Sequence, residues 1–280
     1  MTNIWKDRTR LLKDIREGRN LSKIKAKYKK LKKCPACGRH IGIEELCKNS
    51  YICSCGHYFP MPAKKRLDNI LDSEYEIIEK EMPFENPLDF PDYDRKFLKA
   101  HMETGLNEAL IIARGKIEGH SCIIFVMESE FFMGSMGKNT GRLIKSAIEL
   151  AREEKLPLIS FAVSGGARMQ EGIFSLMQMA NTVNSLYKFL KDGLYISVLT
   201  NPTMGGVSAS FASLGDIILA EKGTRIGFSG PRVIEKTLNV TLPENFQSPK
   251  EVLDFGFLDD ILERNNFRPY LARLLDFYEV

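Results

Sequence analysis

Short apolar runs alternate with amphipathic stretches from about residue 105 onward. Each run has the length of a buried strand, and each amphipathic stretch repeats its apolar residues at the three- and four-residue spacing of a helix face. This order predicts right-handed crossovers and a largely parallel sheet that is covered on both faces. The predicted strands are Ser121–Met127, Leu158–Val163, Leu194–Thr200 and Asp216–Ala220.

Two apolar stripes define the helices between these strands. We interpret both stripes as core packing, because an amphipathic helix normally turns its apolar face toward the sheet that it covers. The first stripe is Leu143, Ala147, Leu150 and Ala151, and the second is Met169, Ile173, Leu176, Met177, Ala180 and Val183.

The chain before residue 105 is organised differently. The stretch MPAKKRLDNILD predicts a connecting helix, whereas the proline-rich stretch EMPFENPLDFPDY interrupts regular structure. We therefore expect a domain boundary near residue 60. The 280 residues are enough for one large domain with a small appendage.

The charge is distributed unevenly along the chain. Residues 1–33 contain 13 Lys or Arg and 3 Asp or Glu, a net charge of +10, whereas the remaining 247 residues carry −6. Such a basic head is either a solvated tail or a contact surface for nucleic acid, acidic lipid or an acidic partner. No apolar stretch reaches the roughly 18 residues of a membrane span, and the N-terminus is too charged for a secretory signal. We expect a cytoplasmic protein.

Five of the six cysteines lie between Cys34 and Cys55. In a chain without an export signal, clustered cysteines indicate metal binding rather than disulfides. Cys34 and Cys37 form a C-x-x-C pair, and fifteen residues separate Cys37 from Cys53, as in four-cysteine zinc ribbons. These residues predict one structural Zn²⁺ ion.

The fourth zinc ligand is less fixed by spacing. Cys55 follows Cys53 after one residue instead of two, which makes the second knuckle tighter. Cys55 is the favoured ligand, with Cys47 and His57 as alternatives. Cys122 lies in an apolar run, and we expect it to be a small buried side chain.

Two glycine pairs follow two of the predicted strands. Gly165–Gly166 comes after the second strand and Gly205–Gly206 after the third, each just before a helix. Glycines let a substrate approach the backbone, and the N–H groups at the start of a helix are free to donate. The pairs therefore predict N–H donors for an oxygen that becomes negative during a reaction.

Other catalytic motifs are absent from the sequence or incomplete in it. Neither Ser164 nor Ser208 lies in the G-x-S-x-G elbow of a serine hydrolase. The segment around Lys138 lacks the spacing and the final Ser or Thr of a phosphate-binding loop. All four histidines precede the glycine turns, so a histidine base is not indicated.

Six motifs occur in one order from about residue 28 to the C-terminus, and together they resemble the beta subunits of bacterial acetyl-coenzyme A carboxylase carboxyltransferase. The motifs are CPACG with CSCGHYF, ENPLDFPDY, FFMGSMGKNTG, SFAVSGGARMQEGIFSLMQM, LTNPTMGGVSASFASLGD and IGFSGPRVIE. The single residue between Cys53 and Cys55 departs from the cysteine spacing of this family. The resemblance implies an α/β, crotonase-like (ClpP/crotonase) fold with an N-terminal four-cysteine zinc ribbon. It gives three parts: a basic segment of residues 1–27, a ribbon of residues 28–60 and a carboxyltransferase domain of residues 61–280.

The resemblance also implies a reaction and partners. The reaction transfers the carboxyl group of carboxybiotin to acetyl-CoA, gives malonyl-CoA and is the first committed step of fatty acid biosynthesis. The partners are a carboxyltransferase alpha subunit in an alpha2beta2 assembly, the biotin carboxyl carrier protein and biotin carboxylase.

Site residues follow from the resemblance and from enolate chemistry. We expect Gly205 and Gly206 to supply one oxyanion site. The Ser164–Ala167 turn, with Gly165 and Gly166, shapes the coenzyme A pocket and adds a donor. The alpha subunit completes a second oxyanion site. Cations near loops and helix starts are candidates for the coenzyme A phosphates: Lys138, Arg142, Arg168, Arg225 and Arg232.

Two other functions fit parts of the sequence. A zinc ribbon with a basic head is typical of nucleic-acid-binding proteins. A crotonase-like hydratase or isomerase, acting on acyl-CoA without biotin, needs a carboxylate near the donors. Glu171 is the nearest carboxylate, although its position suits the first turn of a helix, where it stabilises the dipole.

Overall fold

The computed structural model describes residues 31–278, and the predicted basic segment of residues 1–27 lies outside them. A boundary between Phe59 and Pro60 divides the chain into two compact units.

The smaller unit is built on a short antiparallel pair. Strand β1 (Leu31–Lys33) pairs with β2 (His40–Gly42), and helix α3 (Ile43–Lys48) follows directly. A second pair of chain segments meets at an antiparallel bridge between Ile52 and Tyr58. The pairing brings two cysteine-bearing turns into one unit.

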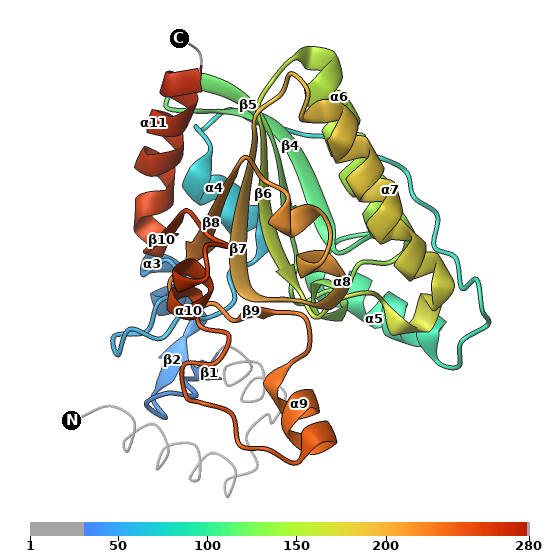
Figure 1. The fold of residues 1–280 in the computed structure, drawn as a ribbon, viewed down its shortest axis with the longest axis vertical. Coiled ribbons are helices and arrows are strands. Elements are labelled where there is room, and N and C mark those ends of the chain that lie inside the picture. Colours follow the sequence, from blue (N-terminus) through green and yellow to red (C-terminus); the bar gives the residue numbers. More distant parts are fainter. Residues whose placement is uncertain (1–30, 279–280) are drawn as a thin grey trace, which may run out of the picture. The chain divides into compact units, whose positions relative to one another are not determined.

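An eight-stranded sheet forms the centre of the larger unit (Figure 1). The order is β10-β8-β7-β6-β5-β4-β3, and β9 pairs with β7 beyond that path. The neighbours from β5 to β10 are parallel, whereas β3 and β4 are antiparallel, so the prediction of a largely parallel sheet is confirmed. All four predicted strands are confirmed, and β7 continues four residues further than expected. The strands are β3 (Glu76–Ile77), β4 (Leu110–Ile117), β5 (His120–Met127), β6 (Leu158–Ser164), β7 (Tyr195–Met204), β8 (Ile217–Glu221), β9 (Ile226–Gly227) and β10 (Asp260–Leu262).

Helices cover both faces of this sheet (Figure 1). Helix α6 packs on one face and α7 packs against α6, while α4 and α11 cover the other face. The predicted connecting helix is confirmed as α4. None of the helices within residues 31–278 has the length and apolar character that crossing a membrane requires. The helices are α4 (Ala63–Ile70), α5 (Tyr93–Thr104), α6 (Lys138–Glu154), α7 (Ile173–Phe189), α8 (Gly205–Ser208), α9 (Pro231–Leu238), α10 (Pro249–Asp254) and α11 (Phe267–Tyr278).

The two predicted apolar stripes have different outcomes. The stripe on α6 is confirmed as core, since Leu143, Ala147 and Ala151 are buried and Leu150 is half-buried. The stripe predicted for α7 is wrong as core packing. Five of its members are exposed and only the last is half-buried: Met169, Ile173, Leu176, Met177 and Ala180, then Val183.

The buried face of α7 carries several polar residues instead. A Cβ at Gly141 of α6 would lie 2.5 Å from the side chain of Gln178, so α6 and α7 pack closely at this point. The polar side chains are satisfied within their own helix: Thr182 Oγ1 donates to Gln178 O at 2.9 Å, and Gln178 Nε2 donates to Phe174 O at 2.9 Å. Because their hydrogen bonds are made locally, burying them costs little.

A buried ion triad ties the two ends of the larger unit together. Arg66 of α4 and Arg264 near the C-terminus both contact Glu221 at the end of β8, at 2.7 Å and 2.6 Å. All three side chains are at most 5% exposed. Burial alone would raise the pKa of Glu221, but the charges and hydrogen bonds of the two arginines outweigh it and lower that pKa to about 2.

Glu221→Gln should lower the free energy of unfolding by about 3–5 kcal/mol at pH 7, because it leaves two buried arginines without a carboxylate. The folded pKa lies below the ordinary value of 4.5, so this stabilisation is complete above pH 4.5 and is lost as the pH falls toward 2. Urea unfolding at pH 7 and pH 3.5 measures the free energy of unfolding of both proteins. The difference between wild type and variant should be smaller at pH 3.5. The control is Glu263→Gln, in an exposed pair with Lys222, which should cost less than about 1 kcal/mol. Equal losses in both variants would contradict the assignment.

Candidate active site and candidate metal centre

The two glycine turns lie back to back at the carboxyl ends of β6 and β7. These strands are parallel neighbours, so the turns that follow them emerge at the same edge of the sheet. Gly166 and Gly205 have φ angles of +117° and +59°, which favour glycine. A Cβ at Gly205 would lie 3.0 Å from Gly166 Cα, and a Cβ at Gly166 would lie 3.4 Å from Gly205 Cα. The backbones are therefore in direct contact.

Three of the four glycine N–H groups already donate hydrogen bonds to acceptors inside the chain. They are therefore not free to bind a substrate oxygen. The N–H of Gly165 donates to Met133 O at 3.0 Å, that of Gly166 to Ser164 Oγ at 2.9 Å and that of Gly205 to Phe228 O at 3.0 Å.

Two N–H groups of the turns remain. Within residues 31–278, the N–H groups of Ala167 and Gly206 have no hydrogen-bond partner. The two residues are close, since a Cβ at Gly206 would lie 3.6 Å from Ala167 Cβ. Both turns thus contribute a free donor, and the two donors lie close together. Sequence reasoning had assigned the pair to Gly205 and Gly206 because adjacency of the two turns is not visible in the sequence.

A left-handed turn before α6 forms the neighbouring wall. Phe132, Met133 and Gly134 have φ angles of +48°, +55° and +65°. Non-glycine residues in this region store strain, which is typical of functional sites. The Met133 side chain is 71% exposed, and it would contact a Cβ at Gly165 at 3.5 Å. This segment belongs to the FFMGSMGKNTG motif of the family resemblance, but its left-handed turn is not visible in the sequence.

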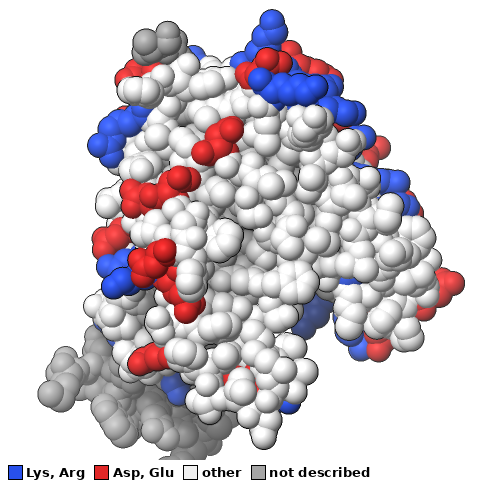
Figure 2. Space-filling view, viewed as in Figure 1, with Lys and Arg blue, Asp and Glu red and all other residues white. Residues whose placement is uncertain are grey.

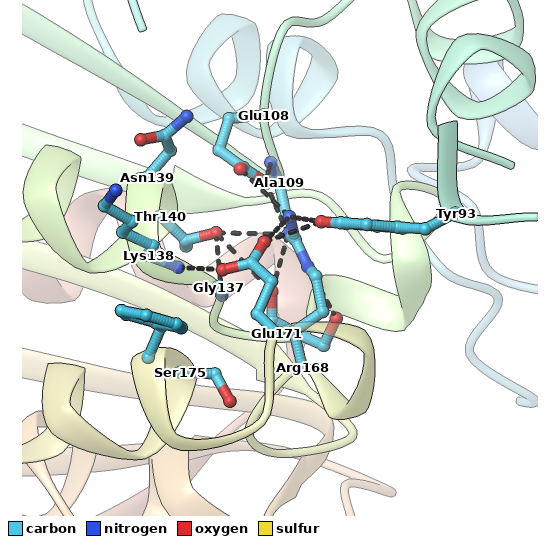
Figure 3. A network of polar contacts seen from close by, with 12 residues as sticks. Tyr93, Glu108, Ala109, Gly137, Lys138, Asn139, Thr140, Arg168, Glu171 and Ser175 are labelled. Atoms are coloured by element: carbon cyan, nitrogen blue, oxygen red, sulfur yellow. Dashed lines mark hydrogen bonds and ion pairs between the residues drawn. The ribbon is translucent and has the colours of Figure 1, made fainter. Parts of the chain in front are cut away.

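A buried polar network surrounds Arg168, which directly follows the first glycine turn (Figure 3). The guanidinium of Arg168 is fully buried and lies between Glu108, Glu171 and Tyr93. Burial would lower the pKa of Arg168, but Glu108 raises it above its ordinary value. The prediction that Arg168 binds coenzyme A phosphates is therefore wrong, because its donors are used inside the protein. Glu108 and Tyr93 are 60 and 75 residues away in sequence, so no local signal could have identified them.

Glu171 belongs to the same network and is not a free acid or base. It accepts hydrogen bonds from Tyr93 Oη at 2.6 Å and from the Lys138 N–H. Burial, reinforced by this bond to Glu171, raises the pKa of Tyr93 above its ordinary value. A hydratase or isomerase that uses Glu171 finds no support in this arrangement.

The other predicted phosphate ligands are nearer the surface. Lys138 and Arg142, on the first turn of α6, both contact Glu85, which neutralises part of their charge. The hydrogen bond from Lys138, together with the charges of Lys138 and Arg142, lowers the pKa of Glu85. Arg225 and Arg232 are exposed, and Arg225 directly precedes β9, the strand that pairs with the end of β7.

The smaller unit brings four cysteines together. The sulfur atoms of Cys34, Cys37, Cys53 and Cys55 all lie within 4.8 Å of one another. Cys34 and Cys55 are 3.7 Å apart, as are Cys37 and Cys53. Four thiolates that converge in this way suit a tetrahedral Zn²⁺ ion. Cys122 is buried in β5 as expected, and burial raises the pKa of its thiol to about 12.

The alternative fourth ligands are not part of this cluster. Cys47 Sγ lies 3.1 Å from Tyr51 Oη, and the ring of His57 packs edge-on against Phe59. The geometry therefore favours Cys55.

Comparison with known proteins gives a consistent result. A family model described as the carboxyl transferase domain matches residues 78–250. A sequence relative is the acetyl-coenzyme A carboxylase carboxyl transferase subunit beta of Ruminiclostridium cellulolyticum. It is 47% identical over 250 residues, which are 88% of this chain and 87% of the relative.

Solved structures share the fold at low identity. A Pseudomonas malonate decarboxylase MdcD–MdcE hetero-dimer has a TM-score of 0.61 at 22% identity and is covered over 86% of its chain. Transcarboxylase 12S, with methylmalonyl-coenzyme A bound, has a TM-score of 0.67 at 22% identity, over 41% of its chain. The geranyl-CoA carboxylase beta subunit of P. aeruginosa has a TM-score of 0.60 at 17% identity, over 39% of its chain. Each comparison covers 78% of the present chain, and together they confirm the crotonase-like α/β fold.

Proposed function

The chain belongs to the carboxyl transferase family that includes the beta subunit of acetyl-coenzyme A carboxylase, and from this membership we propose its reaction. It transfers the carboxyl group of carboxybiotin, attached to a carrier protein, to acetyl-CoA and gives malonyl-CoA. The 47% identity to a named beta subunit supports the reaction. The observation that carries its chemistry is the pair of free N–H groups on the adjoining turns, Ala167 and Gly206.

The two donors stabilise the charge that the reaction creates. Removing a proton from the acetyl methyl group builds an enolate, whose charge lies mainly on the thioester oxygen. Fixed N–H groups aimed at that oxygen lower the barrier without reorganising, and each is worth about 3 kcal/mol. Carboxybiotin supplies the carboxyl group and, once that is released, a base for the methyl proton. We assign Ala167 and Gly206 to the thioester oxygen, and we assign completion of a second oxyanion site to the alpha subunit.

Four cations remain candidates for the phosphates of coenzyme A. Lys138 and Arg142 lie at the start of α6, where the helix dipole also favours an anion, although both contact Glu85. Arg225 and Arg232 lie on the segment that follows the second glycine turn and are exposed. We propose that these two carry most of the attraction.

The exposed apolar face of α7 is the observation that favours binding of a partner subunit. Ile173, Leu176 and Met177 are each more than half exposed. The surface over α7 and α8 in Figure 2 is almost free of charged side chains. An apolar helix face left in water is typical of a protein interface. We propose that the alpha subunit covers it, and that the biotin carrier protein and biotin carboxylase join the same complex.

The smaller unit is proposed to be a zinc ribbon. Cys34, Cys37, Cys53 and Cys55 would hold one structural Zn²⁺ ion, which stabilises a unit too small for a large apolar core. We propose that residues 28–60 form this ribbon and that residues 61–280 form the transferase domain.

Gly206→Val should reduce malonyl-CoA formation by about a hundredfold or more, because a Cβ there would lie 3.6 Å from Ala167 Cβ and a branched side chain would push the two donor residues apart. Its Cβ would lie 3.0 Å from Met179 Sδ, the end of a flexible side chain, so the fold should survive. The assay uses the variant with its alpha subunit, acetyl-CoA and carboxybiotin, and circular dichroism checks the fold. Gly42→Val is the control, since a Cβ there meets nothing within 4 Å. Normal turnover by the Gly206 variant would overturn the donor assignment.

Cys55→Ser should lower the zinc content well below one ion per chain, whereas Cys47→Ser should leave it unchanged, because only Cys55 lies in the sulfur cluster. Elemental analysis of the purified full-length variants measures the metal. Loss of zinc in the Cys47 variant alone would show that the fourth ligand is Cys47.

Leu176→Lys should weaken binding of the alpha subunit by tenfold or more, because it places a charge in an apolar interface that loses its water. Binding is followed by calorimetry or size-exclusion chromatography. Leu98→Lys on α5 is the matched control, since Leu98 is similarly exposed, at 58% against 52%, on a different helix. Unchanged binding by the Leu176 variant would exclude this face as the interface.

A further inference from the structure

We propose that Arg168 is a positioning residue whose buried guanidinium fixes the direction of the Ala167 N–H. The inference rests on the proposed function, which gives that N–H its role at the thioester oxygen. Arg168 does not reach the substrate itself, because its side chain is fully buried. It acts through the two chain segments that meet at Ala167.

The first step is a backbone bridge on both sides of Ala167. The Met136 N–H donates to Gly166 O at 2.9 Å, and the Arg168 N–H donates to Met136 O at 3.0 Å. These two bonds fix the peptides before and after Ala167 to one residue of the loop that precedes α6. The direction of the free Ala167 N–H therefore depends on where that loop lies.

The second step is that the Arg168 side chain holds this same loop. Its Nη2 donates to Ser135 O at 2.9 Å and to Thr140 Oγ1 at 3.2 Å, and its Nε donates to Ser135 Oγ at 3.3 Å. Ser135 directly precedes Met136, so Arg168 binds the loop through its backbone and through its side chain. One residue thus determines the relative position of both segments.

The third step is that the guanidinium itself has little freedom. Glu108 binds it with both carboxylate oxygens, and Glu171 lies 3.3 Å from Nη1 (Figure 3). The carboxylate of Glu171 also accepts hydrogen bonds from the Tyr93 hydroxyl and from the Lys138 N–H, which lies at the positive end of α6. These bonds stabilise its negative charge.

The packing around the network confirms how tightly it is enclosed. A Cβ at Gly137 would lie 2.6 Å from Glu171 Oε1 and 2.9 Å from Arg168 Cζ. The rings of Phe131 and Phe132 lie 5.7 Å and 5.1 Å from the same Cζ. A lysine in this position keeps the charge but loses the planar fork that reaches Ser135, Thr140 and Glu108 together.

Arg168→Lys should therefore lower kcat by about tenfold to a hundredfold and change KM for acetyl-CoA by less than about threefold, because a displaced donor weakens the transition state more than substrate binding. The matched control is Arg264→Lys, a second arginine that is at most 2% exposed and paired with a carboxylate. It should lower the melting temperature but leave kcat per folded chain unchanged. Both variants are assayed with the alpha subunit, and kcat is referred to the folded fraction. Equal effects of the two variants on kcat would overturn the inference.

Tyr93→Phe provides the test if the lysine variant does not fold, since it removes one hydroxyl from the network and keeps the ring. It should lower kcat severalfold, and hydrogen exchange of the backbone N–H groups of Gly165, Gly166 and Arg168 should become faster. Exchange is measured on the beta chain and does not depend on activity. If wild type forms no malonyl-CoA, the proposed function fails, whereas unchanged exchange and kcat in the tyrosine variant would overturn the positioning role.

Discussion

The contact between the backbones of Gly166 and Gly205 is the constraint on which the site depends. Parallel pairing of β6 with β7 brings the ends of both strands to one edge of the sheet, and two residues without side chains let the following turns touch. A Cβ at Gly205 would meet the Gly166 backbone at 3.0 Å, which real Cβ atoms seldom do. Separating the turns by the width of a methyl group would move the free N–H groups of Ala167 and Gly206 apart. The donor pair is thus a property of two turns together and of neither alone.

This arrangement places unusual demands on the surrounding chain. Three glycine N–H groups support the turns, and the N–H groups of Ala167 and Gly206 have no partner in the part of the chain that the structure describes. Three successive residues before α6 have positive φ angles. The unpaired N–H groups and the positive φ angles of Phe132 and Met133 each cost free energy. The ion network of Arg168, Glu108 and Glu171 holds the participating segments in one geometry. Buried ion pairs contribute little net stability in general, but they specify a single arrangement of the groups that they join. A site that must present two N–H groups in fixed directions needs that specification.

Sequence reasoning succeeded where the signal is local. Apolar runs identified the strands, glycine pairs identified the turns, and cysteine spacing identified the cluster that the structure assembles from Cys34, Cys37, Cys53 and Cys55. It failed where segments that are distant in the sequence determine which side chains are buried. Arg168 resembled an exposed cation at a helix start, but partners from 60 and 75 residues earlier in the chain bury it. The stripe on α7 resembled core, but close packing at Gly141 turns a hydrogen-bonded polar face inward. Periodicity reports that a helix has two faces and does not report which face meets the sheet.

The orientation of α7, with its apolar face exposed, connects the site to an apolar surface. The turn that holds Ala167 continues through Arg168 and Glu171 directly into α7, so the donor and the exposed apolar face belong to one uninterrupted segment. Glu171 lies at the junction, where Tyr93 and the first peptide of α6 hold it. A subunit that covers Ile173 and Leu176 therefore rests on a helix whose first turn adjoins the buried network. Covering that face would remove apolar surface from water, and the network that orients the Ala167 N–H also holds the start of the helix that carries this face. The free N–H of Ala167 and the exposed apolar face of α7 thus depend on one set of buried contacts.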